Sequence, residues 1–105
     1  MKRCVLRPLA RQGRQDEVRC CRDEAGAVVA AKLVAALKRA LQTLQRQPAI
    51  GSPMQGREPG LPQMRTRLVD GFPLAFWYVE LEMHIDVVRL VSRQQDALGI
   101  DVDAR

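Results

Sequence analysis

The chain has 105 residues, of which 47% are hydrophobic, and a formal net charge of +5. This length predicts a single domain over residues 1–105, and the hydrophobic fraction is ordinary for a globular protein. No apolar run approaches the ~18 residues of a membrane span, and the basic start lacks the apolar segment of a signal peptide. These features favour a cytoplasmic protein that does not bind membranes.

The three cysteines argue against a disulfide framework and against a zinc site. Their number is odd, Cys20 and Cys21 are neighbours, and Cys4 stands alone, so there is no C-x-x-C pair. We expect reduced thiols, with Cys4 and Cys21 acting as small buried hydrophobic residues. The sequence predicts no metal and no small-molecule cofactor.

The positive charge is concentrated in the first half of the chain. Residues 1–46 carry 11 Lys or Arg against 4 Asp or Glu, whereas the remaining residues carry 6 against 8. A basic segment of this kind suits an acidic partner or a phosphate backbone. No lysine follows Lys38, so every later cation is an arginine, which favours bidentate contacts with carboxylates or phosphates.

The first half of the chain predicts a strand followed by two helices. Residues 1–8 contain a short strand at Cys4–Arg7, which Pro8 ends. Residues 9–47 predict a helical hairpin that breaks at Ala25-Gly26. Its first helix has a weak apolar pattern, weakened further by Gly13, whereas its second has a continuous stripe at three- and four-residue steps. We expect that stripe to pack on a sheet.

The second half predicts an irregular loop at 48–62 and then three strands within 63–93. The loop holds four of the six prolines. The strand-like runs are Met64–Val69, Leu74–Leu81 and His84–Ser92, and their close spacing favours an antiparallel meander. An acidic tail at 94–105 shows no periodicity. The predicted fold is α+β in the order β-α-α-β-β-β, with the helical hairpin packed on a mostly antiparallel, twisted sheet.

Four stretches together make the chain resemble a known superfamily. They read "LRPLARQ", "LVAALKRALQTLQRQPAIGSP", "PGLPQMRTRLVDGFPLAFWYVE" and "HIDVVRLV", and they cover residues from about Cys4 to Asp96. In order and spacing they resemble the RelE/ParE superfamily of toxins from bacterial type II toxin–antitoxin systems. The chain is more similar to the ParE branch. Relatives often end in a His-x-x-Arg-Asp motif, where this chain has Ser92, Gln95 and Asp96.

The resemblance implies two activities for a free toxin. ParE-like members bind DNA gyrase and are not regarded as enzymes, whereas RelE-like members cleave messenger RNA on the ribosome. The missing closing histidine and the lysine-poor sheet favour the ParE-like function, without direct binding of nucleic acid by the toxin. If the chain were a nuclease, its candidate catalytic residues would be Arg65, Arg67, Tyr78 and Arg89. A third alternative is an inactive relative that only binds its antitoxin.

Either toxin would be neutralised by a cognate antitoxin, which the resemblance also implies. An exposed sheet edge and an apolar groove would suit an added strand or an amphipathic helix. The candidate residues for binding the target or the antitoxin are Arg65, Arg67, Trp77, Tyr78, Arg89 and Arg93. Alternation places Phe76 and Tyr78 on one side of their strand and Trp77 on the other. We expect Arg89 to share a face with Arg93, or to pair with Asp86 or Asp96.

The only histidine is an unpromising catalytic residue. His84 matches a strand-start position of the family, and a lone histidine there is more often a surface or capping residue. His84 and Ser92 would lie about 26 Å apart in an extended strand, so they cannot belong to one Ser/His/Asp set.

Overall fold

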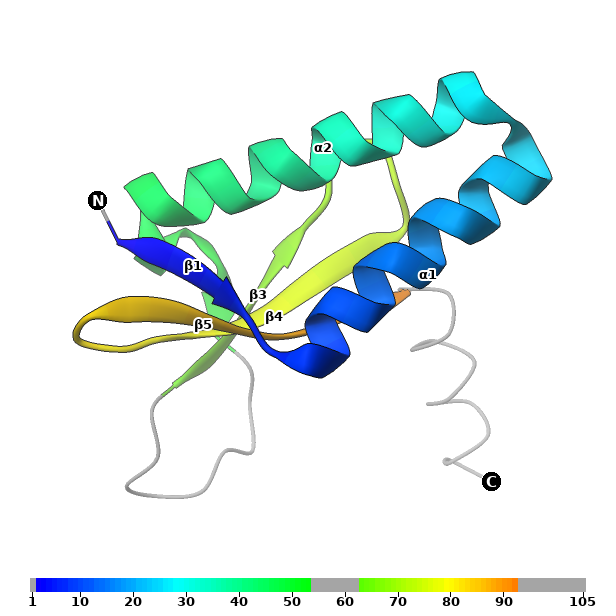
Figure 1. The fold of residues 1–105 in the computed structure, drawn as a ribbon. Coiled ribbons are helices and arrows are strands. Elements are labelled where there is room, and N and C mark those ends of the chain that lie inside the picture. Colours follow the sequence, from blue (N-terminus) through cyan, green and yellow to red (C-terminus); the bar gives the residue numbers. More distant parts are fainter. Residues whose placement is uncertain (1, 54–62, 93–105) are drawn as a thin grey trace, which may run out of the picture.

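The computed structural model describes residues 2–53 and 63–92. In chain order these form β1 (Arg3–Leu6), α1 (Pro8–Ala25), α2 (Ala27–Arg46), the 3-10 turn η1 (Pro48–Ile50), β2 (Ser52–Pro53), β3 (Met64–Leu68), β4 (Leu74–Glu80) and β5 (His84–Ser92). Figure 1 shows the two helices as a hairpin on one side of the sheet. The predicted α+β architecture is confirmed. The predicted tail at 94–105 and the loop residues 54–62 lie outside the described residues.

The sheet has five strands in the order β1-β5-β4-β3-β2. β1 lies parallel to β5, and the other neighbouring pairs are antiparallel. The sheet is therefore mostly antiparallel, as predicted. One expectation was wrong in part: the stretch from Pro48 to Pro53 is not irregular, because it forms η1 and the edge strand β2. A two-residue strand that ends in proline leaves almost no periodic signal in a sequence.

The core lies between α2 and the helix-facing side of β4 and β5. The apolar stripe of α2 is buried, as the sequence predicts. The sheet contributes side chains with no exposed surface, namely Phe76, Tyr78, Ile85 and Val87. Each fully buried side chain of this size stabilises the fold by about 1.5–3 kcal/mol. Tyr78 is the one polar member of this set, and it therefore needs hydrogen-bond partners inside the protein.

A bulge between β4 and β5 decides which way the end of β5 faces. Tyr78 lies opposite Val87, but the preceding residue, Trp77, lies opposite Arg89, so Val88 has no counterpart. An extra residue reverses the alternation of side chains beyond it. Without the bulge Arg89 would share the buried face of Val87. With it, Arg89 faces away from the helices.

Close packing explains why α1 contains Gly13, which weakens its helical signal. Its middle residue Gly13 lies against β5, where a β-carbon would come within 3.2 Å of the Leu90 carbonyl oxygen. The helix can approach the sheet because glycine has no side chain there. α1 ends at Ala25, and the next residue, Gly26, has a φ of 93°, which suits glycine. Within the described residues, no helix is both long and apolar enough to cross a membrane.

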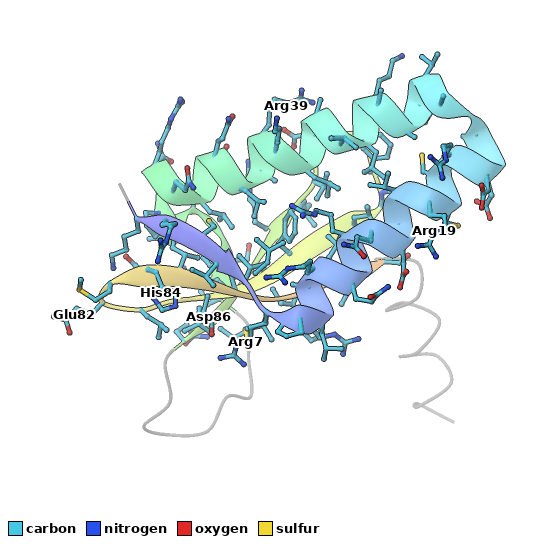
Figure 2. All side chains as sticks on the ribbon, in the orientation of Figure 1. Arg7, Arg19, Arg39, Glu82, His84 and Asp86 are labelled. Atoms are coloured by element: carbon cyan, nitrogen blue, oxygen red, sulfur yellow. The ribbon has the colours of Figure 1, made fainter. Side chains whose placement is uncertain are left out.

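An ion pair joins the start of α1 to the middle of the sheet. Asp86 of β5 is only 7% exposed, and Arg7, which precedes α1, donates from its Nε atom to the Asp86 carboxylate at 2.6 Å. The Nη2 group of Arg7 also contacts that carboxylate. Figure 2 shows the two side chains next to each other. This corrects the expectation that Asp86 would pair with Arg89.

We expect Arg7→Gln to lower the free energy of unfolding by about 2 kcal/mol, because it leaves the buried Asp86 carboxylate without its cation. The half-exposed guanidinium keeps this value well below that of a fully buried pair. Urea denaturation at neutral pH measures the loss. Arg3→Gln is the matched control, since Arg3 is exposed on β1, and it should change stability by less than about 0.5 kcal/mol. Equal losses in both variants would contradict this role of Arg7.

Candidate functional site

The hydroxyl of Tyr78 joins the end of α2 to the middle of the sheet. It donates to the Pro48 carbonyl oxygen at 2.6 Å and accepts from the Gly51 N–H at 2.9 Å. Pro48 begins η1 and Gly51 follows it, so these two bonds hold both ends of that turn. A buried hydroxyl with both partners satisfied rigidifies the structure around it.

Gly51 is required by this contact. A β-carbon there would lie 2.7 Å from the Tyr78 Cε1 atom and 2.8 Å from the Thr66 carbonyl oxygen. Both distances are shorter than real contacts of a β-carbon, and neither neighbour is a flexible chain end. The glycine in the "PAIGSP" stretch therefore has a physical reason: any side chain at this position would displace the Tyr78 phenol.

Arg65 holds the same turn from its other side. It lies opposite Tyr78 in the β3–β4 ladder, so both side chains point to the helix-facing side. Its Nη1 group donates to the Gly51 carbonyl oxygen at 2.9 Å and to that of Ala49 at 3.3 Å. These bonds satisfy carbonyls at the end of a turn, which is a structural task.

Arg67 lies one pair further along the same face, opposite Phe76. Its Nε atom is buried and has no hydrogen-bond partner. A buried, unsatisfied donor costs about 1–3 kcal/mol. On the helix-facing side of the sheet, Arg67 thus differs from Arg65 and Tyr78, whose hydrogen bonds hold the η1 turn.

The environment of Tyr78 makes its hydroxyl a poor base. Burial raises the pKa of Tyr78, and this effect outweighs the Gly51 hydrogen bond and the nearby charges of Arg65 and Arg67, which lower it. The phenol is therefore protonated at neutral pH, and both of its hydrogen bonds are already made within the protein. A general base needs the opposite arrangement, namely a pKa near the working pH and a free lone pair facing the substrate.

Two candidate residues lie on the other side of the sheet. Trp77 faces away from the helices, and the Arg89 guanidinium lies over its ring at 5.9 Å from the ring centre. Such a stack contributes about 0.5–1 kcal/mol at an exposed site. Arg89 is exposed and Trp77 is half-buried. The sheet thus separates Arg89 from the three nuclease candidates on the helix-facing side, which are Arg65, Arg67 and Tyr78.

His84 and Ser92 stand at opposite ends of β5. His84 is half-buried beside Arg3, and Ser92 pairs with Leu74. The structure therefore does not bring them together with an aspartate. Within the described residues, no three His, Cys, Asp or Glu side chains meet in a way that could hold a metal ion. Arg93, the sixth predicted binding residue, lies outside the described residues.

The helical hairpin carries a groove that the apolar pattern of either helix alone does not predict. We call it the cationic groove: it is a cavity of about 350 Å³ between α1 and α2, with an apolar base formed by Val18, Val34 and Leu37. Four positively charged side chains surround this base, namely Arg14, Arg19, Arg22 and Lys38. Val34 is 44% exposed, so part of this apolar base is open to solvent. The basic first half of the sequence was the only signal that pointed here.

Comparison with known proteins rests on structure alone. No protein-family model matches the chain, and no curated protein matches its sequence. Among solved structures, a chain from the chromosomal ParDE TA system of P. aeruginosa matches with a TM-score of 0.71. The match covers 88% of this chain and 96% of that chain, at 17% sequence identity. The chain has a ParE-like fold. The fold that the sequence resemblance predicts is thereby confirmed.

We expect Tyr78→Phe to lower the free energy of unfolding by about 1–3 kcal/mol, because the Pro48 carbonyl and the Gly51 N–H lose their buried partner. The damage should be local. Hydrogen exchange of the Gly51 amide should accelerate strongly, whereas exchange of the β4–β5 ladder should follow only the drop in global stability.

Phe72→Leu serves as a control, because it alters a partly buried aromatic ring that packs on the core, whereas the Gly51 amide and the Pro48 carbonyl bond to Tyr78. It should leave the relative protection of the Gly51 amide unchanged. A slow Gly51 amide in Tyr78→Phe would contradict the role assigned to the hydroxyl.

Proposed function

We propose that this protein is the toxin of a bacterial type II toxin–antitoxin system, that it acts by binding a cellular target, and that an antitoxin neutralises it. The ParE-like fold supports the general assignment. The observation that carries the mechanism is the commitment of the Tyr78 hydroxyl and the Arg65 guanidinium to the η1 turn. Groups that hold the fold in this way are not free to act on a substrate.

The same geometry argues against the messenger RNA nuclease alternative. Cleavage of a phosphodiester needs cations around the reacting phosphate and a group that moves a proton. Here Arg89 lies on the opposite side of the sheet from Arg65 and Arg67, and the Tyr78 phenol is buried and protonated. His84 is half-buried at the far end of β5. No described side chain completes the set, so a binding mechanism is favoured.

DNA gyrase is the target that we propose, in the cytoplasm, on the basis of the ParE-like resemblance. The surface that we propose for this contact is the outer side of the sheet, where the exposed Arg89 stacks on Trp77 and where Leu68 is 46% exposed. Aromatic and arginine side chains are enriched in the centres of protein interfaces. The nuclease and the inactive relative remain the alternatives that experiments must separate.

The antitoxin site that we propose is the cationic groove. Its apolar base suits the apolar face of an amphipathic helix, and its four cations suit acidic residues beside that face. Such a partner would be acidic overall, which matches the basic charge of the first half of the chain. The groove and the Trp77–Arg89 stack lie on different surfaces.

Purified protein at micromolar excess should inhibit supercoiling by DNA gyrase and leave ribosome-bound transcripts intact. Expression without the neighbouring gene, which we expect to encode the antitoxin, should arrest growth, and expression of both genes should restore it. Charge reversal at the groove by Arg22→Glu with Lys38→Glu should weaken the antitoxin complex at least tenfold, because favourable charge pairs become repulsive.

The matched control for charge reversal is Arg39→Glu with Lys32→Glu. Both residues are exposed on α2, and neither lines the groove. This control should bind the antitoxin within about threefold of the native affinity. Transcript cleavage that disappears in Arg89→Ala would favour the nuclease. Unchanged growth in the absence of an antitoxin would favour an inactive relative.

A further inference from the structure

A second groove lies on the other side of α1. We call it the acidic groove: it is a cavity of about 310 Å³ bounded by the second half of α1, by Leu33 of α2 and by the β3–β4 turn. Phe72, Leu74 and Cys21 contribute apolar surface to it, and all three pack on the core. Glu17, Cys20 and Glu24 border it along α1.

The two grooves carry opposite charge because the acidic and basic side chains of α1 lie on different sides of the helix. With 3.6 residues per turn, Glu17 and Glu24 lie seven residues apart on one side of the helix. Arg14, Arg22 and Val18 lie on the other side, where they line the cationic groove. No aspartate or glutamate lines the cationic groove, and no lysine or arginine lines the acidic one within the described residues.

The carboxylates of the acidic groove have no cation of their own among residues 2–53 and 63–92. The ion pairs found there involve Glu80 and Asp86, not Glu17 or Glu24. Partial burial, together with the charges of Asp16 and Glu24, raises the pKa of Glu17. The neighbouring Glu24 carboxylate raises the pKa of the Cys20 thiol. In a protein with a net charge of +5, this is a local site of unbalanced negative charge.

We propose that the acidic groove receives an arginine or lysine side chain of the partner protein that occupies the cationic groove. The apolar surface suits the methylene stem of such a residue, and the carboxylates suit its charged head. Arginine fits better than lysine, since its planar fork can donate two hydrogen bonds to one carboxylate. The identity of the partner as an antitoxin rests on the proposed function, but the chemistry of the groove does not.

A single segment could fill both grooves by crossing α1. A helix is about 10 Å wide, a distance that three or four extended residues span. Such a segment would carry apolar and acidic residues over the cationic groove, and apolar and basic residues beyond the crossing. This order of charges specifies the register of the partner on the hairpin, because a reversed segment would place like charges together.

Two short peptides test the groove without any antitoxin. The first, acetyl-Leu-Arg-Leu-amide, and its charge-reversed partner, acetyl-Leu-Glu-Leu-amide, are titrated into the full chain at low salt and followed by amide NMR shifts. The arginine peptide should shift the amides of residues 17–25 and 72–74, and the glutamate peptide should not. Glu17→Gln with Glu24→Gln should weaken arginine-peptide binding at least tenfold, as expected for losing charged hydrogen bonds.

Glu82→Gln is the charge control, because it removes an exposed carboxylate at the β4–β5 turn; it should leave peptide binding within twofold of native. Equal shifts with both peptides, binding that survives loss of both carboxylates, or shifts confined to the cationic groove would overturn the proposal. Peptide binding that appears only in the Arg93→Gln variant would also overturn the proposal. The chain's own Arg93 would then be the residue that occupies the acidic groove.

Measurements on the intact complex separate this proposal from the proposed function. If the neighbouring gene product binds, its affinity should fall at least tenfold in Glu17→Gln with Glu24→Gln but not in Glu82→Gln. An unchanged affinity of the complex would overturn the proposal that a basic side chain of the partner binds in the acidic groove. It would leave the toxin assignment intact. The chain could also bind the arginine peptide selectively and yet never affect growth when expressed. That result would support the proposed role of the acidic groove and count against the toxin assignment.

Discussion

The buried hydroxyl of Tyr78 is the contact that organises the rest of this structure. It lies at the centre of the sheet with no exposed surface, and it holds the turn that leads from α2 to the edge strand β2. Gly51 and Arg65 complete the same arrangement, one by leaving space and the other by satisfying carbonyls. The "PAIGSP" stretch, the β3 arginine and the β4 tyrosine are therefore parts of one structural unit, although they are far apart in the sequence.

This unit also supports the proposed binding mechanism. A hydroxyl that fastens a turn, in a site that raises its pKa, does not move protons for a substrate. The bulge at Val88 then turns Arg89 to the opposite surface, where it stacks on Trp77. Two surfaces then remain as the proposed binding surfaces, one on the helical hairpin and one on the outer side of the sheet. That arrangement favours a protein that acts through protein partners.

Much of the fold could be predicted from the sequence, because the α2 stripe and the alternation of β4 are periodic signals that dominate their segments. The rest depended on long-range contacts. The bulge inverts the alternation on which the expected position of Arg89 rested, and the partner of Asp86 is Arg7, 79 residues away along the chain. The alternation of side chains along β4 predicted that Tyr78 shares a face with Phe76. It did not predict the η1 turn, which bonds to the Tyr78 hydroxyl. Each groove forms only where separate elements pack together, so the sequence of one element does not predict it.

The most direct test of this account is the toxicity of Tyr78→Phe, compared with the native chain at a temperature where circular dichroism shows both to be folded. The account predicts that the folded variant still arrests growth and still inhibits gyrase, because the hydroxyl only stabilises the turn. A folded Tyr78→Phe protein that no longer arrests growth, while the native chain does, would contradict the account and would assign chemistry to the hydroxyl.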